Sequence, residues 1–222
     1  MKSLQIHIEV SPNLYLKNPD SSELGRKIVS HSVELINELG FEGFTFKKLG
    51  QKINSPESSI YRYFENKHTL LVYLLSWYWS WIDYQLVFAT INVDSSIDKI
   101  KKAIIVLTQP TIIDQSISYI NEVLLSEIVV KESTKAYHTI NVDNENEKGF
   151  FKTYKQVVQR VSDIILEVNP TFPFPHMLVS TVIEGAHQQK YFAIHLPALT
   201  DVKKGNDSIS EFYTKMVLKV VQ

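Results

Sequence analysis

The segment SPESSIYRYFENK, residues 55–67, decides the fold because it holds signals for the start of two helices. Ser55 is a favourable N-cap, and Pro56 suits the first helical position, where its missing N–H costs nothing. Asn66 is a second capping residue, and a long apolar run begins four residues after it. We therefore predict a short helix that ends near residue 64, followed at once by a longer helix over about 67–90.

The side chains of the short helix divide into an apolar and a polar side. Ile60 and Phe64 are four residues apart, so they point inward together. The other positions carry hydrogen-bond donors: Ser58, Ser59, Tyr61, Arg62 and Tyr63. An arginine can read guanine through two hydrogen bonds, and Ser and Tyr hydroxyls reach phosphates. The pattern is typical of a helix that contacts DNA.

Two further helices are predicted before the quoted segment. The first begins after Asp20, which fits a capping box with Glu23, and it ends at Gly40. The second begins at Thr45 and ends at Asn54, a residue type that tolerates the left-handed backbone region. A supporting helix, a short helix, a tight turn and another short helix make a helix-turn-helix, whose second helix enters the major groove.

The apolar run that follows, residues 70–91, is long enough to cross a bilayer. Asp83 lies in its interior, and a carboxylate at the centre of a membrane costs roughly 2.5–3.5 kcal/mol. A buried helix in an all-α domain is therefore the better interpretation. Because pockets are mostly apolar, its aromatic residues are candidates for ligand binding, with plain core packing as the alternative. The candidates are Trp77, Trp81, Tyr84 and Phe88.

Composition limits the classes of protein that the chain can be. Of its 222 residues, 44% are hydrophobic, enough for a sizeable core. The absence of cysteine excludes disulfides, zinc–thiolate sites and cysteine nucleophiles. The net charge of −1 gives no overall attraction to nucleic acid, so any basic patch must be local. The first residues lack a continuous apolar core, so we expect no secretory signal there.

The rest of the chain has no motif of comparable strength. Residues 1–20 are predicted to form an arm, with a weak strand-like alternation at Ile6, Ile8 and Val10. The polar segment 141–149 is predicted to break two helices. Further helices are predicted at about 95–108, 117–138, 149–168, 174–195 and 208–221.

Glu184 and His187 form an E-x-x-H pattern, which di-iron bundles use twice, together with two further glutamates. The sequence holds no second E-x-x-H, so we expect neither a metal nor another cofactor. His187 and Gln188 are instead candidate polar residues of a ligand pocket or a subunit interface. No Ser, His and acid stand at a recognisable spacing, and we expect the protein not to be an enzyme. Two alternatives stay open: a helical-bundle metalloenzyme, and a helical interaction protein without DNA binding.

The segment GRKIVSHSVELINELGFEGFTFKKLGQKINSPESSIYRYFENKHTLL resembles the DNA-binding domain of TetR-family transcriptional regulators. Four features carry the resemblance as a set: Gly40-Phe41, Phe44-Thr45, the Ile-Tyr-x-Tyr-Phe pattern at 60–64, and Asn66-Lys67 followed by Leu70-Leu71. The turn departs from the Gly-Val-Ser that is usual in the family, because this chain has Asn54-Ser55-Pro56.

The resemblance implies which residues contact DNA. Those expected to contact phosphates are Thr45, Tyr61, Tyr63 and Lys67. Those expected to face the bases are Glu57, Ser58, Ser59 and Arg62. Lys47 and Lys48 stand near them in the sequence and are added as candidates for the same face. Between residues 22 and 75, seven Lys and Arg face six Glu, so we expect modest non-specific binding.

The resemblance also implies the architecture and the partners. The implied protein is all-α. It has an arm (1–20), a helix-turn-helix DNA-binding domain (21–66) and a regulatory domain (67–222) that binds a small molecule and dimerises. A long fourth helix joins the last two domains. The implied protein is a cytoplasmic homodimer, a repressor on a palindromic DNA operator, without a membrane partner. The helices at 149–168 and 174–195 are candidates for the subunit interface, with Ser180, Gly185 and Ala186 allowing close approach.

Overall fold

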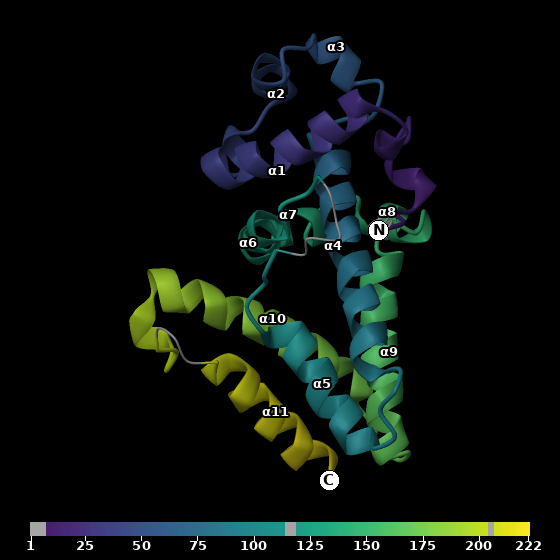
Figure 1. Cartoon of the computed structure of the whole chain (residues 1–222), viewed down its shortest axis with the longest axis vertical. Coiled ribbons are helices and arrows are strands. Elements are labelled where there is room, and N and C mark those ends of the chain that lie inside the picture. The colour runs from purple at the N-terminus through teal and green to yellow at the C-terminus, as the bar shows by residue number, and fades with distance from the viewer. Residues whose placement is uncertain (1–7, 114–118, 204–206) are drawn as a thin grey trace, which may run out of the picture. The chain divides into compact units, whose positions relative to one another are not determined.

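The computed structural model describes residues 8–113, 119–203 and 207–222, which form helices joined by turns (Figure 1). No strand occurs in these ranges, so the prediction of an all-α fold is confirmed. Of the strand-like alternation, Ile6 lies outside the described residues, while Ile8 and Val10 belong to an irregular segment. Among the described helices, none is long and apolar enough to span a membrane.

Contacts between residues divide the chain into two compact units. The first comprises the described parts of Met1–Ser80 and Thr111–Lys152, and the second comprises Trp81–Pro110 and the described parts of Thr153–Gln222. Helix α4 (Lys67–Thr90) contributes residues to both units.

The first unit contains the three helices predicted before α4. These three helices are α1 (Glu23–Gly43), α2 (Phe46–Lys52) and α3 (Glu57–Ile60). Besides them and the first part of α4, the unit contains η1 (Pro12–Leu14), η2 (Pro19–Ser21), α6 (Glu122–Glu132), α7 (Thr134–Tyr137) and α8 (Val142–Glu147). One apolar side of each helix forms a common core, in which Leu49, Ile60 and Phe64 are fully buried. The inward direction predicted for Ile60 and Phe64 is thereby confirmed.

The predicted capping box at the start of α1 is wrong. Ser22 is the N-cap residue, and its Oγ accepts the N–H of Gly25 at 3.1 Å. Asp20 belongs to η2, and its carboxylate accepts a hydrogen bond from the hydroxyl of Tyr119. Glu23 pairs with Lys27, one helical turn later, at 2.7 Å. The local signal was therefore overridden by a partner 99 positions away in the sequence.

The region between α5 and α9 is more broken than predicted. The helix expected at 117–138 consists of α6 and α7, and its residues 117–118 lie outside the described ranges. The segment 141–149, expected as a break, contains α8. Glu145 of α8 is buried, and its Oε1 lies 2.8 Å from Nε2 of His68 in α4. This contact gives a polar segment a fixed position on the first unit.

Helices α1 and α6 are linked at the point where α1 ends its regular course. The backbone turns at Gly40 with a φ of 69°, in the left-handed region that favours glycine, as predicted. The N–H of Phe41 then donates to Oε1 of Glu132 at 3.0 Å. The other carboxylate oxygen of Glu132 pairs with Lys135 at 2.9 Å, which raises the pKa of that lysine. Glu132 thus satisfies a backbone N–H that the turn leaves without a helical partner.

The second unit contains the last part of α4, α5 (Ser96–Thr108), α9 (Lys152–Val168, whose first residue falls in the first unit), α10 (Pro175–His195), η3 (Pro197–Leu199) and α11 (Ser208–Val221). Helix α5 packs against both α10 and α11. Gly185 of α10 permits a close approach of α11, since an added Cβ would lie 2.1 Å from Oη of Tyr213. Gly185, expected at a subunit contact, therefore faces a helix of its own chain.

Asp83, whose charge argued against a membrane span, is neutralised within the second unit. Nε and Nη2 of Arg160 donate to its two carboxylate oxygens at 2.6 and 2.9 Å. Such two-pronged pairs are among the stronger hydrogen bonds in proteins, because both partners are charged and their geometry matches. The pair raises the pKa of Arg160 and fixes α9 against α4.

We expect Glu132→Ala to lower the free energy of unfolding by about 1–3 kcal/mol, because the N–H of Phe41 loses its buried acceptor. Glu132→Gln keeps an acceptor oxygen and should cost less. Denaturant unfolding followed by circular dichroism measures both. The control is Glu38→Ala, at a glutamate whose side chain is 66% exposed, with an expected change within about 0.5 kcal/mol. Equal stability of Glu132→Ala and the unchanged protein would contradict the assigned contact.

Candidate nucleic-acid interface

The turn between α2 and α3 is fixed by backbone contacts. Asn54 has a φ of 52°, so it adopts the left-handed conformation predicted for it. The N–H of Ser55 donates to the carbonyl of Gly50 at 2.9 Å. A Cβ on Gly50 would lie 2.7 Å from the carbonyl oxygen of Ser55, closer than real side chains come. A glycine is therefore required in α2 for the turn to close.

The start of α3 differs from the prediction in one detail. Helix α3 begins at Glu57, and Pro56 takes the N-cap position without a side-chain cap. Ser55, predicted as the cap, lies one residue earlier, in the turn, where its N–H donates to the carbonyl of Gly50. The turn Asn54-Ser55-Pro56, which departs from Gly-Val-Ser, is thus closed by the contact of Ser55 with Gly50.

Helix α3 turns its polar side to solvent. Glu57, Ser58 and Arg62 are exposed, and Ser59 is half-buried. Tyr61 is 47% exposed; its ring packs edge-on against Phe46 with centroids 5.0 Å apart. These side chains stand on α3 and its C-terminal turn, at the end of the first unit that α2 and α3 form in Figure 1.

Helix α2 presents further predicted residues at the same turn. Thr45 caps α2, with its Oγ1 accepting the N–H of Lys48 at 3.2 Å, as its position predicted. Lys47 is exposed and lines a cleft of about 480 Å³ together with Glu57 and the residues of the turn. Nζ of Lys48 donates to the carbonyl of Gly43 at 2.7 Å, so this lysine also holds the end of α1.

Two predicted phosphate contacts are engaged within the protein. Tyr63 is only 3% exposed, and its hydroxyl lies 2.8 Å from Oγ of Ser22. Lys67 is half-buried, and its Nζ donates to the backbone carbonyl of Phe41 at 3.1 Å. The same Nζ lies 4.6 Å from the centre of the Phe41 ring. Asn66, predicted to cap the next helix, does so by accepting the N–H of Thr69 at 2.9 Å. No local pattern indicates these contacts, because Ser22 and Phe41 are far from Tyr63 and Lys67 along the chain.

The residues predicted to bind a ligand have different environments. Trp77, in the first unit, is buried. In the second unit, Trp81 and His187 are buried, whereas Gln188 is exposed. The rings of the half-buried Tyr84 and the 65% exposed Phe88 are 4.5 Å apart. Burial, followed by the charge of Lys190, lowers the pKa of His187 to about 3, so this imidazole is neutral.

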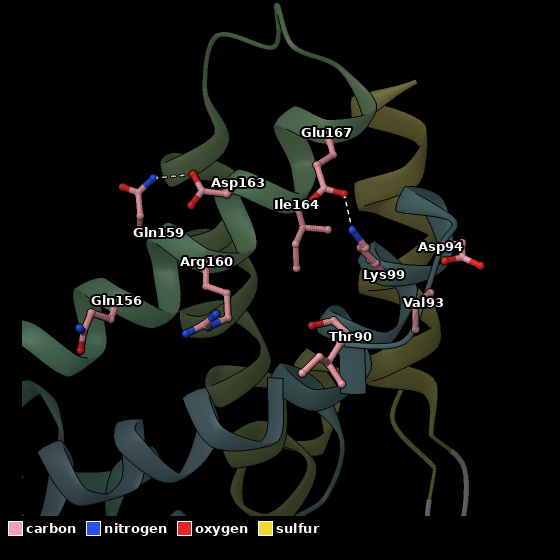
Figure 2. Close-up of a pocket in the computed structure, with 11 residues that line it drawn as sticks. Thr90, Val93, Asp94, Lys99, Gln156, Gln159, Arg160, Asp163, Ile164 and Glu167 are labelled. Carbon is pink, nitrogen blue, oxygen red and sulfur yellow. Dashed lines mark hydrogen bonds and ion pairs between the residues drawn. The ribbon is translucent and has the colours of Figure 1, made fainter. Parts of the chain in front are cut away.

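A groove of about 730 Å³ lies elsewhere in the second unit, between α9 and the turn from α4 to α5 (Figure 2). It is lined by Thr90, Ile91, Val93, Asp94, Lys99, Gln156, Gln159, Arg160, Asp163, Ile164 and Glu167. Figure 2 shows the ion pair of Lys99 with Glu167, at 2.8 Å, on its wall. None of the predicted ligand-binding residues lines this groove. Most of its polar lining lies on the exposed side of α9, which aromatic content does not reveal.

The E-x-x-H pair does not gain further metal ligands. Oε1 of Glu184 accepts a hydrogen bond from the hydroxyl of Tyr154 at 2.8 Å. Within the part of the chain that the structure describes, no group of three His, Asp or Glu residues is arranged to hold a metal ion.

Helices α2 and α3 are short, are joined by a closed turn and are supported by α1, and the polar side of α3 is exposed. This arrangement is that of a helix-turn-helix DNA-binding regulator. Residues 28–74 match the model of the bacterial regulatory proteins of the tetR family. Over these residues the chain therefore carries a domain of the tetR-family type.

Most of the chain is similar in fold to solved structures, including the following two. One is the superantigen PfiT, with a TM-score of 0.58 and 15% identity over 91% of this chain and 97% of that chain. The other is AibR in complex with isovaleryl coenzyme A and operator DNA, with a TM-score of 0.56 and 12% identity over 86% of this chain and 97% of that chain. At such identities the likeness is one of fold, and a fold alone does not determine a function. A comparison with curated proteins gives no match.

We expect Gly50→Ala to weaken DNA binding at least tenfold, because its Cβ must displace the turn before α3. Crowding a packed site of this kind costs about 1–3 kcal/mol, so the melting temperature should also fall. Fluorescence anisotropy with operator DNA and thermal unfolding measure the two effects. Gln51→Ala, at the next and exposed position of α2, is the control and should change both much less. Unchanged DNA affinity in Gly50→Ala would show that the turn does not position α3 for binding.

Proposed function

We propose that the chain is a ligand-responsive transcriptional regulator that represses by binding a palindromic operator as a homodimer. One observation carries the proposal: α3 exposes a polar side that includes Glu57, Ser58 and Arg62, at the end of a closed helix-turn-helix. In this proposal α3 enters the major groove, where exposed Arg62 reads a guanine and Glu57, Ser58 and Ser59 face neighbouring bases. The proposal assigns no catalytic activity to the chain.

Phosphate contacts would fix the position of α3 on the duplex. The proposed groups are Thr45, Lys47, Lys48, Tyr61, Tyr63 and Lys67. Thr45 and Lys47 are exposed at the start of α2, and Tyr61 is exposed after α3. Lys48, Tyr63 and Lys67 are engaged in contacts within the protein, so DNA binding would share or replace these contacts. Positive charges barely outnumber negative ones between residues 22 and 75. We therefore expect specific contacts to contribute much of the affinity for the operator.

The homodimer is proposed to use α9 and α10. Helix α10 carries exposed apolar side chains in its first turn, with Met177 67% exposed and the preceding Phe174 58% exposed. Exposed apolar residues of this size gain most from a contact that excludes water. A twofold axis would present two copies of α3 to successive major grooves of a palindrome, about 34–36 Å apart.

The regulatory part, proposed as residues 67–222, would bind a small molecule. The structure of similar fold solved with operator DNA also holds isovaleryl coenzyme A, which makes acyl-coenzyme A thioesters the first class to test. The proposed contacts are Trp77, Trp81, Tyr84, Phe88, His187 and Gln188. Helix α4 would transmit binding, because it starts beside the helix-turn-helix and runs into the second unit. The ligand can act only through different affinities for the DNA-binding and released states.

Selection of operators from random DNA should enrich a palindrome, and variants of α3 should then separate two kinds of contact. Arg62→Ala should weaken binding by about 1–3 kcal/mol and relax the preference at one base pair of each half-site. Tyr61→Phe should weaken all sequences alike, because it removes a phosphate contact. Lys148→Ala, an exposed lysine outside the helix-turn-helix, is the control. Equal and salt-insensitive binding by all four proteins would contradict the proposal.

The ligand response is tested with the same operator. Acyl-coenzyme A thioesters, beginning with isovaleryl coenzyme A, are screened for a rise in melting temperature. A thioester that stabilises the protein should weaken operator binding by about 5–150-fold, the range of common coupling energies. Phe88→Ala should weaken thioester binding with little loss of stability, because this side chain is 65% exposed. A thioester that saturates the protein and leaves operator affinity unchanged would contradict the proposed response.

A further inference from the structure

The described part of the N-terminal arm, residues 8–20, is attached to the helix-turn-helix by specific contacts. Leu14 is fully buried. The N–H of Leu16 donates to the carbonyl of Tyr63 at 2.8 Å, and the Tyr63 hydroxyl lies 2.8 Å from Oγ of Ser22. Tyr63 lies in the C-terminal turn of α3. The arm thus binds its carbonyl, and the N-cap residue of α1 binds its hydroxyl.

Contacts with α1 and α4 fix the arm further. The rings of Tyr15 and Tyr73 meet edge-on with centroids 6.2 Å apart. A Cβ on Gly25 would lie 2.2 Å from the carbonyl oxygen of Pro19, so the arm passes against the first turn of α1 at a distance that only a glycine permits. A segment held at so many points has a defined position beside α3.

Lys17 stands in the middle of this fixed segment and is exposed. Its Nζ lies 5.1 Å from the centre of the Tyr63 ring, within the range of a cation–π contact. Tyr63 directly follows Arg62, the exposed arginine proposed to read a base. The arm therefore places a second cation beside the C-terminal turn of α3.

The electrostatics of Tyr63 agree with this arrangement. Its pKa is lowered, first by the hydrogen bond from Ser22 and further by Lys17 and Arg62. Two cations thus favour a negative charge at the Tyr63 hydroxyl. A phosphate oxygen close to this position would experience the same attraction.

We propose that Lys17 is a further DNA-binding residue, which contacts a backbone phosphate next to the bases that α3 faces. An ammonium group on a flexible stem suits a phosphate as a point charge, whereas base reading favours planar groups on the recognition helix. The arm then has two roles: it fixes the end of α3, and it adds a sequence-independent contact to the DNA. The inference rests on the proposed DNA binding.

The test compares Lys17→Gln, Lys17→Arg and the unchanged protein on the selected operator. Dissociation constants are measured by fluorescence anisotropy between about 50 and 200 mM salt. Lys17→Gln should weaken binding about three- to tenfold at the lower salt and reduce the salt slope by about 0.9 for each phosphate that is no longer neutralised. Lys17→Arg keeps the charge and should keep the slope. Lys148→Gln makes the same charge change at an exposed lysine of the first unit outside the helix-turn-helix.

The outcomes separate the inference from its basis. Absence of operator binding by the unchanged protein would contradict the proposed function and the inference together. If the unchanged protein binds but Lys17→Gln keeps its affinity and slope, only the inference is overturned. A weaker affinity with an unchanged slope and a lower melting temperature would show that Lys17 merely stabilises Tyr63. An equal effect in Lys148→Gln would show an influence of net charge alone, and it would also overturn the inference.

Discussion

The close approach of two backbone segments at Gly50 is the constraint on which the DNA-binding end of the molecule depends. The carbonyl of Gly50 accepts the N–H of Ser55, and no room is left for a side chain between them. Because α3 is only four residues long, it has little helical stability of its own. Its direction is set by this turn, by the buried Ile60 and Phe64, and by the arm that holds Tyr63. The exposed side chains of α3 therefore have a fixed support.

The helix-turn-helix is not isolated from the sequence that follows it. Contacts place the described residues of Thr111–Lys152 in the same compact unit, and polar pairs join α1 to α6 and α7. Asn37 binds Glu127 at 3.0 Å, and Lys135 pairs with Glu42 at 3.3 Å, on either side of the Phe41–Glu132 contact. A change in α6 or α7 would thus act on the end of α1.

Much of the fold could be predicted because its signals are local. Gly40 and Asn54 take the left-handed conformations that their residue types favour, and Thr45 and Asn66 cap the helices that they precede. The predictions that were wrong depended on distant partners. Asp20 could not be recognised as an acceptor for Tyr119, nor the polar helix α8 as anchored through His68. The candidate site divides in the same way. Exposed residues of α3 follow from helical spacing around two buried positions, whereas the burial of Tyr63 and the position of Lys17 depend on how the arm folds back, which no periodicity encodes.

The central claim is that the exposed side of α3 meets DNA. Hydrogen exchange of the backbone amides, followed by mass spectrometry with and without the selected operator, tests it most directly. Exchange should be slower in peptides that cover residues 45–67 and the arm at 8–20, because both would lie against the duplex. If the operator binds but the exchange of residues 57–63 stays the same, α3 does not meet DNA.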